Sequence, residues 1–164
     1  CTVLHENGHA LFPNGSPEAG RIGGEALGII DEVKAEITYR ALIPEMIERG
    51  GIEGSEKEWA LGMLGRVLQQ LRDQPEGDFY FYDAVYPLNC LIESGAVTFT
   101  ENKLQIENID LYYETMKNAA REVLKLYEDE DMNEEKAKKW IQKRCKANKT
   151  VAEVADFIKT VKIQ

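Results

Sequence analysis

Apolar residues recur every three or four positions along most of the chain, and this spacing predicts a protein built mainly from helices. The clearest case is residues 25–48, whose apolar positions are Leu27, Ile30, Val33, Ile37, Ala41 and Leu42. We expect one long, mostly buried helix there, kinked or split at Pro44 and stopped by Gly50 and Gly51. The same spacing predicts helices over residues 55–73, 108–127, 133–146 and 150–159.

Shorter segments complete the pattern. Residues 1–10 can form a short helix, which the proline-rich stretch after it ends, and a loop is expected up to Gly24. The aromatic segment 79–94 is expected to become helical in its later part. Residues 96–100 and 103–107 carry β-branched residues around an Asn turn, which predicts a hairpin. The predicted fold class is therefore mainly α, a helical domain with one small β-hairpin.

Length and composition predict a single domain. A chain of 164 residues with 43% hydrophobic residues can bury one core but hardly two, so we expect one domain over residues 1–164. The chain opens at Cys1 inside an apolar segment and without an initiator methionine. We therefore expect a C-terminal fragment of a longer protein, with the missing N-terminal part of the same polypeptide as a partner.

The charge balance argues against two classes of partner. Twenty Lys and Arg stand against 29 Asp and Glu, which gives a net charge of −9. Such a surface repels a phosphate backbone and an anionic bilayer, so we expect no nucleic acid and no membrane partner. The apolar runs are also far shorter than the roughly 20 residues that span a bilayer. Three scattered cysteines form no disulfide framework, which favours a cytoplasmic protein.

Two histidines carry the strongest chemical signal. They fall at His5 and His9, and Glu6 follows the first, which gives an HExxH motif. Residues four apart lie on one face of a helix, so two imidazole nitrogens can bind one Zn²⁺. A metal-bound water has a depressed pKa, and Glu6 is expected to take its proton as general base. The motif predicts zinc-dependent hydrolysis of a peptide or small amide substrate.

A catalytic zinc of this type takes a third protein ligand, and the next helix offers four carboxylates. These are Glu25, Asp31, Glu32 and Glu36. Acidic side chains are costly to bury without a partner, yet three of them lie in an otherwise apolar helix. We expect Glu32 to bind the metal, with Glu25 or Glu36 as substitutes. Asp31 and Glu36 are then expected to accept the outer N–H groups of the two imidazoles.

These stretches resemble a known family. The segment HENGHALFP, followed after a loop by IIDEVKAEITYRALIPEMIERGGI, resembles the zinc-binding region of the dipeptidyl peptidase III family, and most closely its relatives fused to Nudix hydrolase domains. The resemblance implies a zinc metallopeptidase. It also makes Glu32, the second acidic residue of the DEVKAE stretch, a zinc ligand. A fainter resemblance to the hairpin and closing helices of the family covers residues 91–145.

The chain departs from that family in two ways. Its HENGH motif is one residue shorter than the motif of the peptidases proper, and it matches the shorter form of the Nudix-linked relatives. The peptidases also use a later histidine, whereas no histidine follows His9, so a tyrosine, an arginine or the upstream part would have to polarise the substrate. Two alternatives to an enzyme remain: a non-catalytic zinc-stabilised regulatory or binding domain of a larger protein, and a metal-free helical interaction module.

Overall fold

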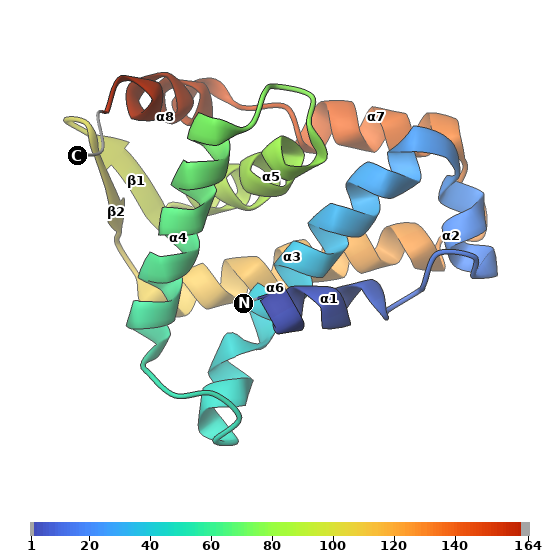
Figure 1. The fold of residues 1–164 in the computed structure, drawn as a ribbon, viewed down its shortest axis with the longest axis horizontal. Helices are drawn as coiled ribbons and strands as arrows, with labels where there is room; N and C mark the ends of the chain where they lie inside the picture. The colour runs from blue at the N-terminus through green and yellow to red at the C-terminus, as the bar shows by residue number, and fades with distance from the viewer. Residues whose placement is uncertain (1, 162–164) are drawn as a thin grey trace.

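The computed structural model describes residues 2–161, and within them the chain forms eight helices and one two-stranded sheet (Figure 1). The prediction of a mainly α fold with one small β-hairpin is confirmed. In chain order the elements are α1 (Thr2–His9), α2 (Pro17–Ile22), α3 (Gly24–Glu48), α4 (Glu56–Asp73), α5 (Phe79–Ser94), β1 (Val97–Thr100), β2 (Lys103–Ile106), α6 (Ile109–Glu128), α7 (Glu134–Arg144) and α8 (Lys149–Thr160).

The long helix α3 lies at the centre of the fold (Figure 1). It packs against α1, α4, α5, α6 and α7, so that nearly every face of its middle turns is buried. The predicted break at Pro44 does not split the helix, which continues to Glu48. An internal proline removes one backbone hydrogen bond and crowds the preceding turn, but Ile43 lies in the core and the partly buried Ile47 packs against it, which holds the last turn in place.

Two helix starts differ from the prediction, and in both a capping side chain is the reason. The expected loop up to Gly24 contains α2, because the Ser16 side chain accepts a hydrogen bond from the Ala19 amide and Pro17 occupies the first helical position. Helix α5 begins at Phe79 rather than later, because Asp78 accepts from the Tyr80 amide at 2.9 Å. Both helices start from a cap and not from a long apolar repeat.

The remaining elements follow the sequence pattern closely. Helix α4 opens with a capping box, in which Ser55 and Glu58 satisfy each other's backbone amides. The hairpin pairs Val97 with Ile106 in antiparallel register. Its turn residues Glu101 and Asn102 both adopt positive φ, as a two-residue turn between twisted strands requires.

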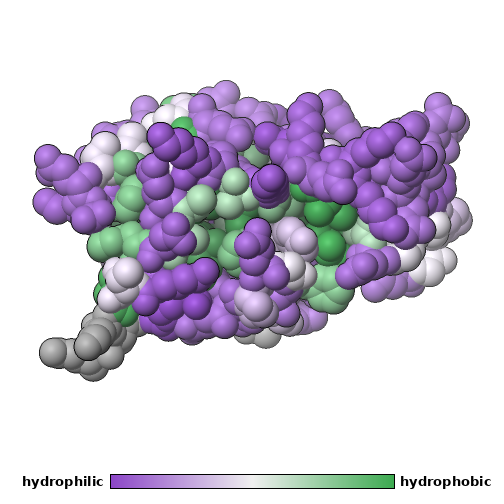
Figure 2. Space-filling model, turned by 90° about the horizontal axis from the view of Figure 1, so that it is seen from above, coloured by the Kyte–Doolittle hydropathy of each residue, from purple (hydrophilic) through white to green (hydrophobic). Residues whose placement is uncertain are grey.

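Seen from above, the molecular surface is largely hydrophilic, with apolar side chains gathered in a band across the middle (Figure 2). Over the described part of the chain, no helix combines the length and the apolar character needed to cross a membrane.

Candidate metal centre

The site begins with the close approach of two helices. Helix α1 packs on α3, and at their contact Gly8 lies directly over Ala35. A Cβ atom built on Gly8 would come within 2.5 Å of the Ala35 Cα and 2.7 Å of its carbonyl oxygen, so only glycine fits this position. The small residue brings one face of α1, which carries His5 and His9, onto the acidic turns of α3.

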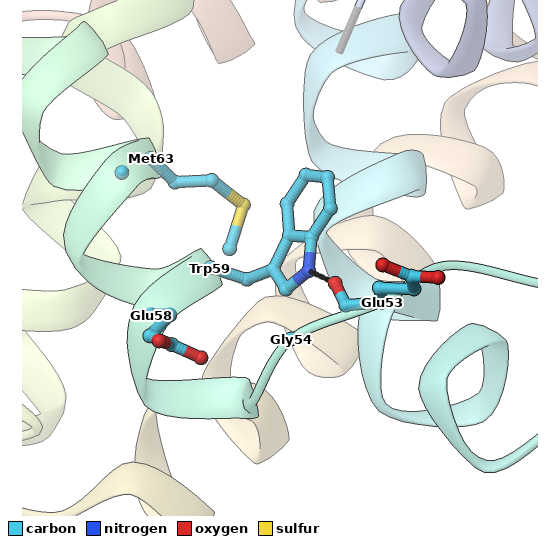
Figure 3. Close-up of a pocket in the computed structure, with 6 residues that line it drawn as sticks. Glu53, Gly54, Glu58, Trp59 and Met63 are labelled. Atoms are coloured by element: carbon cyan, nitrogen blue, oxygen red, sulfur yellow. Dashed lines mark hydrogen bonds between the residues drawn. The ribbon is translucent and has the colours of Figure 1, made fainter. Parts of the chain in front are cut away.

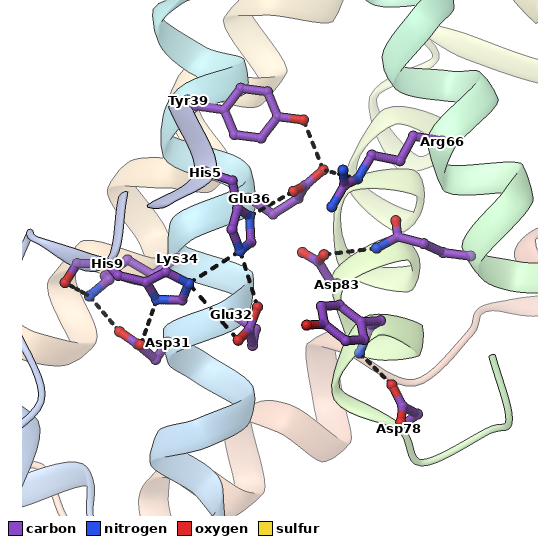
Figure 4. A network of polar contacts seen from close by, with 12 residues as sticks. His5, His9, Asp31, Glu32, Lys34, Glu36, Tyr39, Arg66, Asp78 and Asp83 are labelled. Carbon is purple, nitrogen blue, oxygen red and sulfur yellow. Dashed lines mark hydrogen bonds and ion pairs between the residues drawn. The ribbon is translucent and has the colours of Figure 1, made fainter. Parts of the chain in front are cut away.

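Three side chains converge where the helices meet (Figure 4). One ligand atom each from His5, His9 and Glu32 lies within 4.8 Å of the other two. The Nε2 atoms of the two histidines are 3.2 Å apart. The Glu32 oxygens lie 3.2 Å from Nε2 of His5 and 3.9 Å from Nε2 of His9. Within residues 2–161, this is the one group of His, Cys, Asp and Glu side chains close enough to hold a metal ion.

The spacing of these atoms fits a single ion. Ligand atoms bound tetrahedrally at about 2.0–2.1 Å lie about 3.3 Å from one another. The separation of the two Nε2 atoms and that of Oε2 of Glu32 from Nε2 of His5, both 3.2 Å, are close to that value. The other Glu32 oxygen, Oε1, lies 3.9 Å from Nε2 of His9, so the carboxylate would have to turn for one of its oxygens to face both imidazoles. Two neutral imidazoles and one carboxylate also leave one tetrahedral position free for a water or a substrate atom.

Each imidazole forms a hydrogen bond through Nδ1 to a carboxylate of α3. Nδ1 of His5 donates to Oε2 of Glu36 at 3.0 Å, and Nδ1 of His9 donates to Oδ2 of Asp31 at 2.7 Å. A proton on each Nδ1 leaves each Nε2 as the ligand atom. Carboxylates in this position also fix the ring orientation and make the ligand nitrogen more basic. Asp31 and Glu36, which we expected to accept the outer N–H groups of the imidazoles, each lie within hydrogen-bonding distance of one Nδ1 atom.

A buried lysine compensates the charge of Asp31. Lys34 is fully buried, and its ammonium group lies 2.6 Å from Oδ1 of Asp31. The same ammonium donates to the backbone carbonyl of Leu11, and those of His9 and Phe12 lie 3.5 Å away. A cation at the C-terminal end of a helix interacts favourably with its free carbonyl groups. Lys34 therefore ties the end of α1 to the carboxylate that orients His9.

Glu36 has a corresponding set of partners. Its Oε1 atom accepts from the guanidinium of Arg40, which is fully buried, and from the Tyr39 hydroxyl at 3.0 Å. The Nε atom of Arg66, on α4, lies 3.5 Å away. Burial by itself would raise the pKa of Glu36, but Arg40 and the hydrogen bond from His5 hold that pKa well below its usual range. Glu36 is therefore ionised and available to hold His5.

The neighbouring carboxylates raise the pKa of His5. Hydrogen bonds to Glu32 and Glu36 raise the pKa of His5 to about 10, although burial opposes the shift. In addition, Asp83 of α5 points toward this cluster and is fully buried (Figure 4). Burial raises the pKa of Asp83 well above its usual range, and the nearby charge of Glu36 adds to the effect. The cluster thus favours a cation, whether a proton or a metal ion, at the imidazole.

The other sequence-predicted residues lie outside the cluster. Glu6 is exposed on α1, directly after His5. Glu25, one of the substitute ligands, is exposed at the start of α3 and is absent from the group of ligand atoms. Glu36, the other substitute, binds His5 through Nδ1 and so lies on the far side of the ring from the ligand atoms.

Sequence reasoning missed the cations that support the site. Lys34 and Arg40 follow their carboxylates by three and four positions in the same helix, and this spacing could have revealed them as partners. Arg66 and Asp83 come from α4 and α5, and no local pattern marks them. Gly8 could also have been recognised from the sequence. Glycine weakens a short helix, so its presence there suggests a position where close packing requires the smallest residue.

Two hollows lie near these helices. One of about 460 Å³ is lined by Trp59 and Met63 together with Gly54, Gly62 and two glutamates (Figure 3). The indole N–H of Trp59 donates a hydrogen bond to the Glu53 carbonyl at 2.8 Å. This hollow contains no residue of the metal cluster. A second hollow of about 260 Å³ between α4 and α5 is polar and includes Arg66, which connects it to Glu36.

The contact between Gly8 and Ala35 leads to a first prediction. Gly8→Ala should destabilise the protein by about 1–3 kcal/mol, because the added methyl group forces the two backbones apart. Thermal unfolding monitored by circular dichroism measures the effect. Gly65→Ala is the control: an alanine on this exposed helical position meets nothing within 4 Å, so it should preserve or raise the melting temperature. Equal melting temperatures for the two variants would contradict the proposed packing.

The charge environment of His5 leads to a second prediction. In protein freed of metal by a chelator, the raised pKa keeps His5 protonated at neutral pH, so a metal ion must displace that proton. The apparent affinity for Zn²⁺ should therefore increase about tenfold per pH unit between about pH 6 and 8. Competition with a chromophoric chelator of known pH dependence measures this slope. An affinity independent of pH over that range would contradict a protonated His5 that must lose its proton to bind the metal.

Comparison with known proteins provides no relative for this chain. No family model, no curated protein and no solved structure matches it. The chemistry of the site must therefore be judged on its own side chains, and these form a group that could hold a metal ion.

Proposed function

We propose that this chain is a zinc-dependent hydrolase domain that cleaves a peptide or related amide bond. His5, His9 and Glu32 would hold the ion, and Glu6 would act as general base. The observation that carries the proposal is the convergence of the three ligand atoms within 4.8 Å, with each imidazole oriented by its own buried or partly buried carboxylate. An incidental group of surface acids has no reason to include two histidines whose far nitrogens are fixed in this way.

The donor set favours zinc over Ca²⁺ and Mg²⁺. Ca²⁺ and Mg²⁺ prefer oxygen ligands, whereas two imidazoles with one carboxylate form a familiar catalytic zinc set. When bound, zinc would lower the pKa of a coordinated water and polarise the substrate carbonyl. The chain's own residues supply the rest: Asp31 and Glu36 hold the imidazoles, and Lys34 and Arg40 form ion pairs with those two carboxylates.

The role proposed for Glu6 rests on its place in the HExxH pattern, directly after His5. It is exposed next to His5 and has no ion pair in the part of the chain that the structure describes, so its carboxylate is free to take a proton. A base beside the ligands would accept the proton of the attacking water and return it to the leaving amine. The resemblance of HENGH and DEVKAE to the dipeptidyl peptidase III family supports the same assignment, and the family membership itself remains part of the proposal.

Zinc content tests the ligands. The purified chain should bind about one zinc ion, which elemental analysis would measure, and His9→Ala and Glu32→Gln should lose it. Glu25→Gln is the matched control, since it removes an exposed acid of the same helix and should keep the metal. Absence of zinc from the wild-type chain after reconstitution would contradict the proposal and favour a metal-free helical module.

Turnover tests the base. Glu6→Gln should keep its zinc but hydrolyse a mixture of short peptides about 10²–10⁴-fold more slowly than the wild type, because only proton transfer is lost. Mass spectrometry of the peptide mixture measures the rates, with Glu25→Gln again as control. If the wild-type chain binds zinc and cleaves no peptide, the alternative of a zinc-stabilised binding domain replaces the enzyme. Unchanged turnover in Glu6→Gln would remove Glu6 from the mechanism.

A further inference from the structure

An exposed aromatic ring contacts the helix that carries Glu32. Phe79 is the first residue of α5, and it is 41% exposed. Its Cζ, Cε1 and Cε2 atoms lie 3.4, 3.6 and 3.9 Å from the point where a Cβ atom on Gly28 of α3 would be. These three atoms form the outer edge of the ring. The ring therefore touches α3 with that edge, and much of the rest of the side chain is open to solvent.

The contact lies one helical turn from a metal ligand. Gly28 and Glu32 are four positions apart in α3, so they share one face of the helix, with about 5–6 Å between their Cβ positions. Helical side chains lean toward the N-terminus of their helix, and Glu32 therefore leans toward the turn that holds Gly28. The ring of Phe79 touches the same turn. Phe79 is thus a neighbour of Glu32 on this face of α3.

The metal cluster is accessible from solvent. The side chains of His9 and Glu32 are 25% and 24% exposed, whereas that of His5 is 8% exposed. Figure 4 shows Asp78, the residue before Phe79, across the cluster from His9, with Glu32 between them. A substrate that reaches the exposed ligands would therefore lie between α1 and the start of α5.

The ring is held on a rigid element. Asp78 caps α5 by accepting a hydrogen bond from the Tyr80 amide at 2.9 Å, and Phe81, two positions after Phe79, is buried in the core. A binding residue on a helix is positioned more precisely than one on a loop. The position of Phe79 relative to α3 is therefore set by the fold itself.

Phe79 also differs chemically from the other groups around the cluster. Glu36 and Asp83 are buried acids, and they would not favour an apolar group. An exposed phenyl ring, in contrast, is stabilised when apolar surface covers it. Aromatic partners gain further from edge-to-face or offset stacking.

We propose that Phe79 forms one wall of a subsite for an apolar or aromatic side chain of the substrate, on a residue next to the scissile bond. The inference rests on the proposed function and narrows its substrate class to peptides with a hydrophobic residue at that bond. Residues of an extended peptide follow one another every 3.3–3.6 Å or so, which brings a side chain next to a bond at the cluster within reach of a ring one helical turn away. Phe79 would be a specificity-determining residue, because it contacts neither the attacking water nor the bond that breaks.

A pair of zinc-binding compounds tests the subsite without requiring turnover. Acetohydroxamic acid and 3-phenylpropionohydroxamic acid share the metal-binding group, and the second adds a benzyl group. Calorimetric titration into the zinc-loaded protein should show at least about tenfold tighter binding of the phenyl compound, because its ring is covered by Phe79. Phe79→Ala should remove most of this preference, and Phe79→Leu should retain part of it. Acetohydroxamic acid should bind the wild type and both variants equally, since a merely structural role of Phe79 would weaken both compounds together.

Leu61→Ala is the matched control, because it removes an exposed apolar side chain from α4 and should leave the preference intact. Equal binding of the two compounds by the wild type would overturn the subsite, as would an unchanged preference in Phe79→Ala. If Phe79→Ala fails to fold, an unchanged preference in Phe79→Leu overturns it instead. Absence of zinc and of binding by either compound contradicts the proposed function, whereas zinc with binding of acetohydroxamic acid and no preference contradicts the subsite alone.

Discussion

The site depends on buried ion pairs within a single helix. Asp31 with Lys34 and Glu36 with Arg40 lie on α3, and three of these four side chains are within 1% of complete burial while Asp31 is 6% exposed. Unpaired charges at such positions would cost several kcal/mol each, and a partner one helical turn away removes most of that cost. Each carboxylate still has an oxygen free for an imidazole. The histidines of α1 are thus oriented by acids whose own position is fixed by the core.

These ion pairs make α3 different from an ordinary core helix, because they place charged side chains in its buried part. A buried helix normally presents apolar residues on every side, whereas α3 places charged groups toward α1, α4 and α5. Their cations also reach beyond the helix: Lys34 lies 4.9 Å from the centre of the Tyr127 ring on α6. Both electrostatic and apolar contacts therefore position α3. The same helix belongs to the core and to the candidate site.

Most of the fold could be predicted from the sequence, because the apolar repeat is clear in α3, α4 and α6. The elements that were missed or shortened, α2 and the first turn of α5, begin from single capping residues, Ser16 and Asp78, which carry little weight against a repeat. The grouping of His5, His9 and Glu32 was accessible because two local spacings, in HENGH and DEVKAE, each restrict one helix face. Arg66 and Asp83 were not accessible, since only the packing of α4 and α5 against α3 brings them close.

Because α1 is short, a metal ion bound at this site would also affect the stability of that helix. Helices shorter than about 12–15 residues are marginal in water on their own, and α1 has 8 residues and packs mainly on α3. Its docking and the assembly of the ligand set are therefore one cooperative event. An ion that binds only the docked form adds its binding free energy to the local stability of α1. The occupancy of the site by a metal ion would then set how large a fraction of the molecules keeps α1 docked on α3.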